Sequence, residues 1–178
     1  MKESPRNFCE QRLWDDGYVQ AELFVAPPDD LIRRWLQKHV PSGQGSCLEL
    51  GCFPGRYLAV LGELGYEVNG IDLTPRVEQD LKPWLQRQGY RVGEFIRDDV
   101  FTHAFRRRYD IVCSFGLIEH FEDWPGLLRR HAGSQHAQLP RWRTAALTPL
   151  VRSGKLLPAQ FGRDVSRQVG ASHTGARP

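Results

Sequence analysis

The sequence lacks the features that mark membrane, secreted and metal-binding proteins. No apolar run in its 178 residues approaches the roughly 18 residues that span a bilayer. The polar start, residues 1–7, has no apolar stretch behind it and predicts no secretory signal. The four cysteines have no CxxC spacing and the six histidines have no metal-ligand spacing. We therefore expect a cytoplasmic protein with reduced thiols, no metal site and no membrane association.

Acidic side chains are almost missing from the last 48 residues, which hold seven basic residues and one acidic residue. Residues 1–130 hold 17 Lys and Arg against 20 Asp and Glu, so the net charge of +3 comes from the C-terminal segment. Aromatic residues are also scarce there, while Arg, Ala, Gly, Ser and Pro dominate. We therefore expect a basic, poorly structured tail, and we do not interpret the charge as affinity for nucleic acid.

Strand and helix patterns alternate through the middle of the chain. The predicted strands cover residues 47–50, 67–72, 90–96 and 109–115, and the predicted helices 31–39, 57–64, 75–85 and 123–130. Leu31 and Leu36 are expected on the inner face of the first helix, and Pro83 is expected to kink or split the third. This alternation predicts an α/β fold, a doubly wound parallel sheet with helices on both faces. Ligands of such sheets bind beyond the carboxyl ends of the strands.

The turn after the first strand predicts a nucleoside-containing cofactor. It reads Glu49-Leu-Gly-Cys-Phe-Pro-Gly55, and its glycines allow a tight turn and a close approach of backbone to a ligand. Asp72 follows Gly51 by 21 residues, a spacing that suits hydrogen bonds to ribose hydroxyls. Phe53 stands where a dinucleotide turn needs glycine, and Pro54 has no amide N–H for a pyrophosphate. A nucleoside with an amino-acid tail therefore suits this turn better than NAD(P), although an NAD(P)-binding oxidoreductase stays as an alternative.

Three more motifs follow this turn in order. They are Gly70-Ile-Asp-Leu-Thr-Pro75, Arg97-Asp-Asp-Val100 and Tyr109-Asp-Ile-Val-Cys-Ser-Phe-Gly-Leu-Ile-Glu-His-Phe121. Together the four motifs resemble the class I, Rossmann-like S-adenosylmethionine-dependent methyltransferases, and most of all their small-molecule branch. The resemblance implies S-adenosyl-L-methionine as cofactor and methyl transfer to a small-molecule or glycan-like acceptor.

The resemblance also implies which residues hold the cofactor. Gly51, Gly55 and the backbone between them would cradle its methionine part. Asp72 would hold both ribose hydroxyls. Asp99 matches the acid that meets the adenine amino group, and the neighbouring Asp98 is the less favoured candidate for this role. The full cofactor set is Glu49, Gly51, Phe53, Gly55, Asp72, Leu73, Asp99, Val100, Phe115 and Gly116.

Two residues are implied on the acceptor side. Glu119 and His120 match the pair at the mouth of the substrate site. His120 is the candidate catalytic base for an acceptor that carries a proton, because an unperturbed imidazole titrates near pH ~6.5.

The pattern stops near residue 132 and divides the chain into three segments. Residues 1–27 are expected to be a lead-in that caps the substrate site, residues 28–132 an incomplete cofactor-binding domain, and residues 133–178 the tail. The later strands of the family's sheet are missing or degenerate in this tail. We therefore keep a truncated, non-catalytic remnant with weak cofactor binding as an alternative to an active enzyme.

The codons of the tail suggest why the family's pattern stops near residue 132. Read one base forward, codons for Leu139-Pro-Arg-Trp-Arg-Thr-Ala-Ala146 permit a Pro-Gly-Gly turn and an apolar strand, which the family has at this place. We hypothesise a shift of reading frame near residue 133, which the nucleotide sequence would test.

Overall fold

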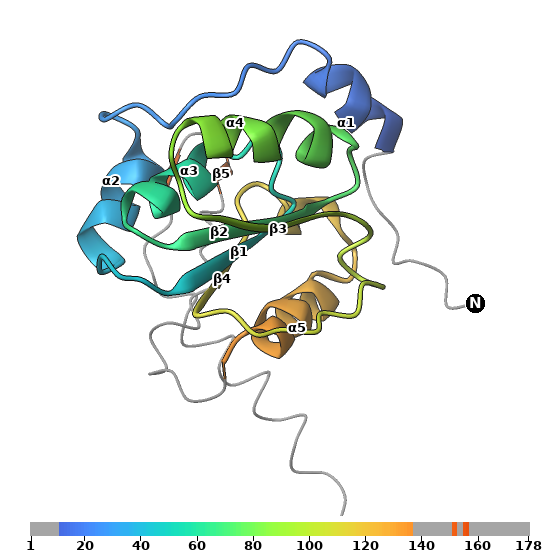
Figure 1. The fold of residues 1–178 in the computed structure, drawn as a ribbon. Coiled ribbons are helices and arrows are strands. Elements are labelled where there is room, and N and C mark those ends of the chain that lie inside the picture. Colours follow the sequence, from blue (N-terminus) through green and yellow to red (C-terminus); the bar gives the residue numbers. More distant parts are fainter. Residues whose placement is uncertain (1–10, 137–150, 153–154, 157–178) are drawn as a thin grey trace, which may run out of the picture.

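The computed structural model describes residues 11–136, 151–152 and 155–156 (Figure 1). Four strands form one sheet in the order β3-β2-β1-β4, and all three pairings are parallel. The strands are β1 (Ser46–Leu50), β2 (Glu67–Asp72), β3 (Val92–Arg97) and β4 (Ile111–Cys113). The predicted α/β fold with a parallel sheet is therefore confirmed.

Helices cover both faces of this sheet, as predicted. Figure 1 shows α5 (Trp124–Ser134) on one side, and α1, α3 and α4 on the other. The further helices are α1 (Gln11–Tyr18), α2 (Leu31–His39), α3 (Arg56–Glu63) and α4 (Lys82–Arg87). A short hairpin of β5 (Val151–Arg152) and β6 (Lys155–Leu156) forms a separate antiparallel sheet. None of the helices in the described part of the chain is long and apolar enough to cross a membrane.

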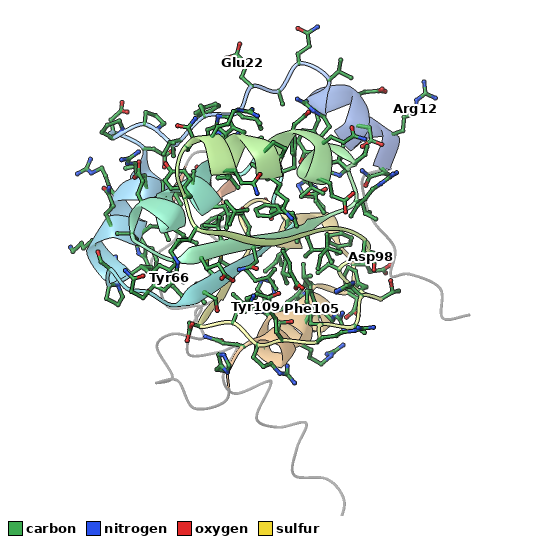
Figure 2. The ribbon with its side chains drawn as sticks, in the orientation of Figure 1. Arg12, Glu22, Tyr66, Asp98, Phe105 and Tyr109 are labelled. Atoms are coloured by element: carbon green, nitrogen blue, oxygen red, sulfur yellow. The ribbon has the colours of Figure 1, made fainter. Side chains whose placement is uncertain are left out.

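The sheet divides the apolar core into two clusters. β1 is buried at every position because helices cover both of its faces, which explains its continuous apolar run. One cluster packs α2, α3 and α4 against the sheet. The other lies on the α5 side, where Phe105 and Tyr109 are seen in Figure 2.

Capping residues begin two helices where the sequence predicts them. Asp30 accepts hydrogen bonds from the backbone amides of Ile32 and Arg33, both at 2.9 Å, and starts α2. Asp123 starts α5 by accepting from the Gly126 amide at 2.8 Å. The predicted inward position of Leu31 is wrong, because its side chain is 58% exposed and only Leu36 of α2 is buried.

The predicted interruption at Pro83 is present as a π-helical turn. This turn (Val77–Leu81) ends where the Lys82 amide bonds to the Val77 carbonyl, one residue before Pro83. Because proline has no amide N–H to donate, the regular α-helical hydrogen-bond pattern cannot run through residue 83. The turn keeps Val77, Leu81 and Leu85 on the buried face, as predicted.

α5 ends later than the helix predicted at residues 123–130. α5 extends to Ser134, whose carbonyl accepts a hydrogen bond from the Tyr109 amide at 2.9 Å. The His136 amide donates to the Tyr109 carbonyl at 3.1 Å, so residues 134–136 lie beside the chain that leads into β4. The predicted tail and the hypothesised frame shift otherwise concern residues that lie outside the described ones, apart from β5 and β6.

Candidate functional site

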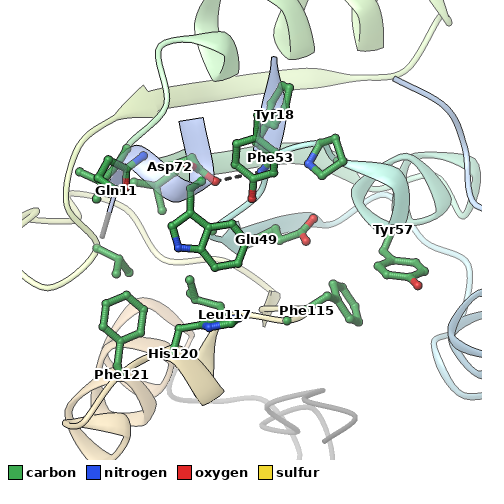
Figure 3. Close-up of a pocket in the computed structure, with 18 of the residues that line it drawn as sticks. Gln11, Tyr18, Glu49, Phe53, Tyr57, Asp72, Phe115, Leu117, His120 and Phe121 are labelled. Atoms are coloured by element: carbon green, nitrogen blue, oxygen red, sulfur yellow. Dashed lines mark hydrogen bonds between the residues drawn. The ribbon is translucent and has the colours of Figure 1, made fainter. Parts of the chain in front are cut away.

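A cavity of about 480 Å³ opens beyond the carboxyl ends of the parallel strands (Figure 3). Its volume lies in the range of small-molecule sites. All the site residues predicted from the sequence line it: Glu49, Gly51, Phe53, Gly55, Asp72, Leu73, Asp99, Val100, Phe115, Gly116, Glu119 and His120. The fold therefore brings together side chains that follow four different strands, while the group that each one binds stays a prediction.

The turn after β1 requires its two glycines. Gly51 has φ +68° and Gly55 has φ +79°, in the left-handed region that side chains other than glycine rarely adopt. A Cβ atom would lie 2.6 Å from Leu117 at the first position and 2.5 Å from Leu81 at the second. The turn therefore brings backbone to the edge of the cavity and leads into the N-terminus of α3.

Asp72 fixes this turn against the end of β2. Its Oδ2 accepts a hydrogen bond from the Phe53 amide at 3.0 Å, and its Oδ1 accepts from the Thr74 amide at 3.1 Å. Burial raises the pKa of the Asp72 carboxyl, and the hydrogen bonds from backbone amides oppose this effect. The carboxylate therefore both holds the loop and borders the cavity, as Figure 3 shows.

Glu49 is a buried carboxylate directed into the cavity (Figure 3). The residue is 3% exposed, and its Oε2 has no hydrogen-bond partner within the described structure. Burial raises the pKa of Glu49 well above its usual value, and the nearby Asp72 carboxylate raises it further, while Arg56 opposes the shift. A buried carboxylate with an unsatisfied oxygen favours a positively charged ligand with N–H donors.

Two acids follow β3 and differ in their partners. Asp98 is exposed, and its Oδ2 lies 2.8 Å from Nδ1 of His103, a contact that lowers the pKa of Asp98. Asp99 is half-buried, and its Oδ1 accepts a hydrogen bond from the Phe101 amide at 2.8 Å. Both border the cavity. Because the Asp98 carboxylate is already in contact with His103, this arrangement is in keeping with the predicted preference for Asp99 over Asp98.

The segment after β4 forms the side of the cavity where the sequence predicts the acceptor. Gly116 has φ +68° and directs the chain into a short 3-10 helix, Ile118–His120. The His120 ring lies edge-on to Trp14, with ring centroids 4.7 Å apart. Phe115 packs against Tyr57, with centroids at 4.7 Å.

One group of lining residues was missed in the sequence. Gln11, Trp14 and Tyr18 of α1 line the cavity, and Tyr18 lies edge-on to Phe53 at 4.9 Å. Their spacing of three and four residues places them on one helix face, and this signal would have identified them. Arg56, Tyr57, Leu117 and Phe121 also border the cavity and were not predicted.

The three thiols in the described part of the chain are buried, and none of them shows a sign of reactivity. Cys47, Cys52 and Cys113 are free and buried, and burial raises the pKa of each thiol. Within the described residues, no group of His, Cys, Asp and Glu side chains is arranged to hold a metal ion.

Comparisons with known proteins extend these observations. A family model described as "Methyltransferase domain" matches residues 18–133. A ubiquinone biosynthesis O-methyltransferase of Thiobacillus denitrificans is 26% identical over 113 residues, which cover 63% of this chain and 48% of the relative. This chain thus spans about half the length of that relative.

Two solved structures have a similar fold. Coclaurine N-methyltransferase aligns with a TM-score of 0.53 and 16% identity, over 68% of this chain and 39% of its own. The N-methyltransferase NodS from Bradyrhizobium japonicum aligns with a TM-score of 0.51 and 17% identity, over 61% of this chain and 59% of its own. At these identities the likeness shows a shared fold.

Proposed function

This chain belongs to the methyltransferase-domain family, and from that premise we propose that it binds S-adenosyl-L-methionine and transfers the methyl group to a small-molecule acceptor. The observation that carries the proposal is the buried Glu49 carboxylate, which is directed into the cavity and has one oxygen without a hydrogen-bond partner among the described residues. S-adenosyl-L-methionine carries a sulfonium and an ammonium group, so its charge matches such a site. The coclaurine N-methyltransferase and NodS structures both contain S-adenosyl-L-homocysteine, the product of this cofactor.

The lining residues fit the parts of this cofactor. Glu49 and the turn 51–55 would hold the methionine part, and Asp72 would accept hydrogen bonds from the ribose. Leu73, which is partly exposed beside the cavity, and the buried Val100 would enclose the adenine, with Asp99 at its amino group. The fit rests on acids and apolar groups and needs no phosphate site.

The same residues disfavour NAD(P). Its pyrophosphate is negatively charged and would face the Glu49 and Asp72 carboxylates across the turn. The amide of Phe53 already donates to Asp72, and Pro54 has no amide to donate. The turn therefore offers few of the donors that a pyrophosphate needs.

The protein contributes alignment and a proton acceptor. When bound, S-adenosyl-L-methionine supplies a methyl group on a positively charged sulfur, which leaves with the electron pair of the broken bond. The residues around the cavity hold the acceptor atom in line and exclude water, which is the main requirement for this reaction. His120 would take the proton that an acceptor O–H or N–H releases, and would pass it to solvent.

Calorimetry with the full 178-residue chain tests the proposal. We expect S-adenosyl-L-methionine and S-adenosyl-L-homocysteine to bind, and NAD to show no heat of binding. Binding of NAD alone would overturn the proposal in favour of an oxidoreductase. Binding of S-adenosyl-L-methionine with no methyl transfer to any acceptor would instead support the alternative of a non-catalytic remnant.

A further inference from the structure

We propose that the acceptor is a flat aromatic molecule that carries a hydroxyl group and no negative charge. This inference rests on the proposed function and narrows its acceptor. Three properties of the cavity support it: the shape of one wall, the balance of charge among the lining residues and the small number of hydrogen-bonding groups on the acceptor side.

Aromatic rings line the side of the cavity that lies across from Asp72. Figure 3 shows Phe121, Leu117, His120 and Phe115 along one side of the cavity, with Asp72 on the other. Phe121 is held edge-on against Phe101, with ring centroids 4.9 Å apart. We call Trp14, Tyr57 and Phe121 the aromatic wall, and each of them lines the cavity. Planar apolar surfaces of this kind favour a planar ring, through stacked and edge-to-face contacts.

The His120 imidazole lies within this wall and is in contact with the Trp14 ring, at 4.7 Å between centroids. A ring packed on the wall would therefore present its substituents to this imidazole. Since His120 is the candidate base, the useful substituent is a hydroxyl, which loses its proton as the new C–O bond forms.

The lining charge excludes an anionic acceptor. Among the residues that the structure describes, the cavity is lined by five carboxylates, Glu49, Asp72, Asp98, Asp99 and Glu119, against the cationic Arg56 and the imidazole of His120. The Arg56 guanidinium lies over the rings of Phe24 and Tyr57, at 5.4 and 5.8 Å. Because carboxylates outnumber the cationic groups even after a positively charged cofactor is added, a carboxylate on the acceptor would be repelled.

The acceptor side also offers little to a sugar. Within the described part of the chain, its hydrogen-bonding side chains are Gln11, Glu119, His120 and the two tyrosine hydroxyls. The Tyr57 hydroxyl already donates to Asp30 at 3.3 Å. A sugar buries several hydroxyls, and each unpaired one costs free energy. The aromatic wall therefore favours a ring with one or few hydroxyls over the glycan-like acceptor that the sequence left open.

Ligand-observed NMR with three probes tests the inference. Methyl gallate is a neutral hydroxylated ring, gallate is its anionic counterpart, and methyl glucoside represents a sugar. With and without S-adenosyl-L-homocysteine, we expect methyl gallate to bind at least about ten-fold more tightly than gallate, and methyl glucoside not to bind. Equal binding of gallate, or binding of methyl glucoside as tight as that of methyl gallate, would overturn the inference.

Variants of the wall assign the binding to this cavity. Trp14→Ala and Phe121→Leu should each lower the affinity for methyl gallate about ten-fold. Val19→Ala, a change at a 69% exposed position just after α1, should leave this affinity unchanged. Retained S-adenosyl-L-homocysteine binding shows that a variant is folded, and unchanged methyl gallate binding in both wall variants would contradict the inference. If methyl gallate binds through the wall but S-adenosyl-L-homocysteine does not bind the native chain, the proposed function fails and the aromatic site stands.

Discussion

At the scale of single residues, the Glu49 and Asp72 carboxylates face one cavity from neighbouring strands. Burial and the Asp72 charge both raise the pKa of Glu49, so at neutral pH its ionised form opposes folding. A raised pKa in the folded state means that stability is lost as the pH rises above the usual value for Glu. A bound cation would offset this unfavourable burial of negative charge. The two carboxylates are therefore better accommodated in a cation-bound protein than in the free protein.

Replacing Glu49 by Gln should separate stability from binding. We expect the free protein to melt about 2–5 °C higher at neutral pH, because a neutral amide avoids the burial of charge. Affinity for S-adenosyl-L-methionine should fall about ten-fold, because the ligand loses its counter-charge. Calorimetry and thermal melts measure both, and a variant that melts lower and binds unchanged would show that Glu49 has a purely structural role.

Replacing Asp72 by Ala should abolish binding of S-adenosyl-L-methionine. The change removes the acceptor proposed for the ribose hydroxyls and the hydrogen bonds to the Phe53 and Thr74 amides. Asp72→Asn is the matched variant, since it keeps a side-chain oxygen for one of these amides while removing the charge. Unchanged affinity in Asp72→Ala, measured by calorimetry, would rule out the ribose role.

At the scale of elements, one distant arginine adds to the ring contacts that hold α1 over the cavity. The Arg76 guanidinium donates to the carbonyls of Tyr18 and Ala21 at the end of α1. It also lies 4.8 Å over the Phe53 ring and 2.5 Å from the Asp80 carboxylate. Arg76 therefore connects the end of α1 with the turn after β1, beside the direct contact of Tyr18 with Phe53.

Replacing Arg76 by Ala should release α1 from the rest of the fold. We expect amide hydrogen exchange in α1 to become at least about ten-fold faster, with no change in β1, because local contacts set local opening. Arg87→Ala, a change of an exposed arginine at the end of α4, is the control. Unchanged exchange in α1 would mean that its packing on the cavity does not depend on Arg76.

At the scale of the whole molecule, a buried histidine makes stability depend on pH. His131 of α5 is 5% exposed, and its ring contacts the Leu127 carbonyl at 2.8 Å and the Ser114 hydroxyl at 3.0 Å. Burial lowers the pKa of His131 to about 4, and the bond to Leu127 opposes this shift. In the unfolded chain the imidazole regains its usual pKa near ~6.5, so between these values the unfolded state binds more protons.

Stability should therefore fall as the pH drops from about 6.5 to 4, by up to about 3 kcal/mol from this group. Denaturant unfolding at several pH values measures the effect, and His131→Gln should flatten the dependence over this window. His39→Gln, a change at an exposed position of α2, should leave it unchanged. An identical pH dependence in the native chain and His131→Gln would show that other groups cause it.

Much of the architecture follows from local patterns. Apolar runs and helical stripes predict the order of strands and helices, because burial on a sheet or a helix face repeats with the period of that element. The cavity lining follows too, since the carboxyl ends of parallel strands meet at one edge and bring the residues after each strand together. The exposure of Leu31 was not predictable, because the sequence does not show whether another segment covers an apolar residue at the start of a helix.

The sequence by itself determined the parallel sheet, the two required glycines and the set of acids beside the cavity. Tertiary structure alone decided how α1 covers that cavity, which oxygen of Glu49 lacks a partner and why His131 stays neutral. These features depend on contacts between segments far apart in the chain, such as Arg76 with Tyr18 and Trp14 with His120. Local periodicity reports whether a residue is buried, whereas its partner and its charge state depend on the packing around it.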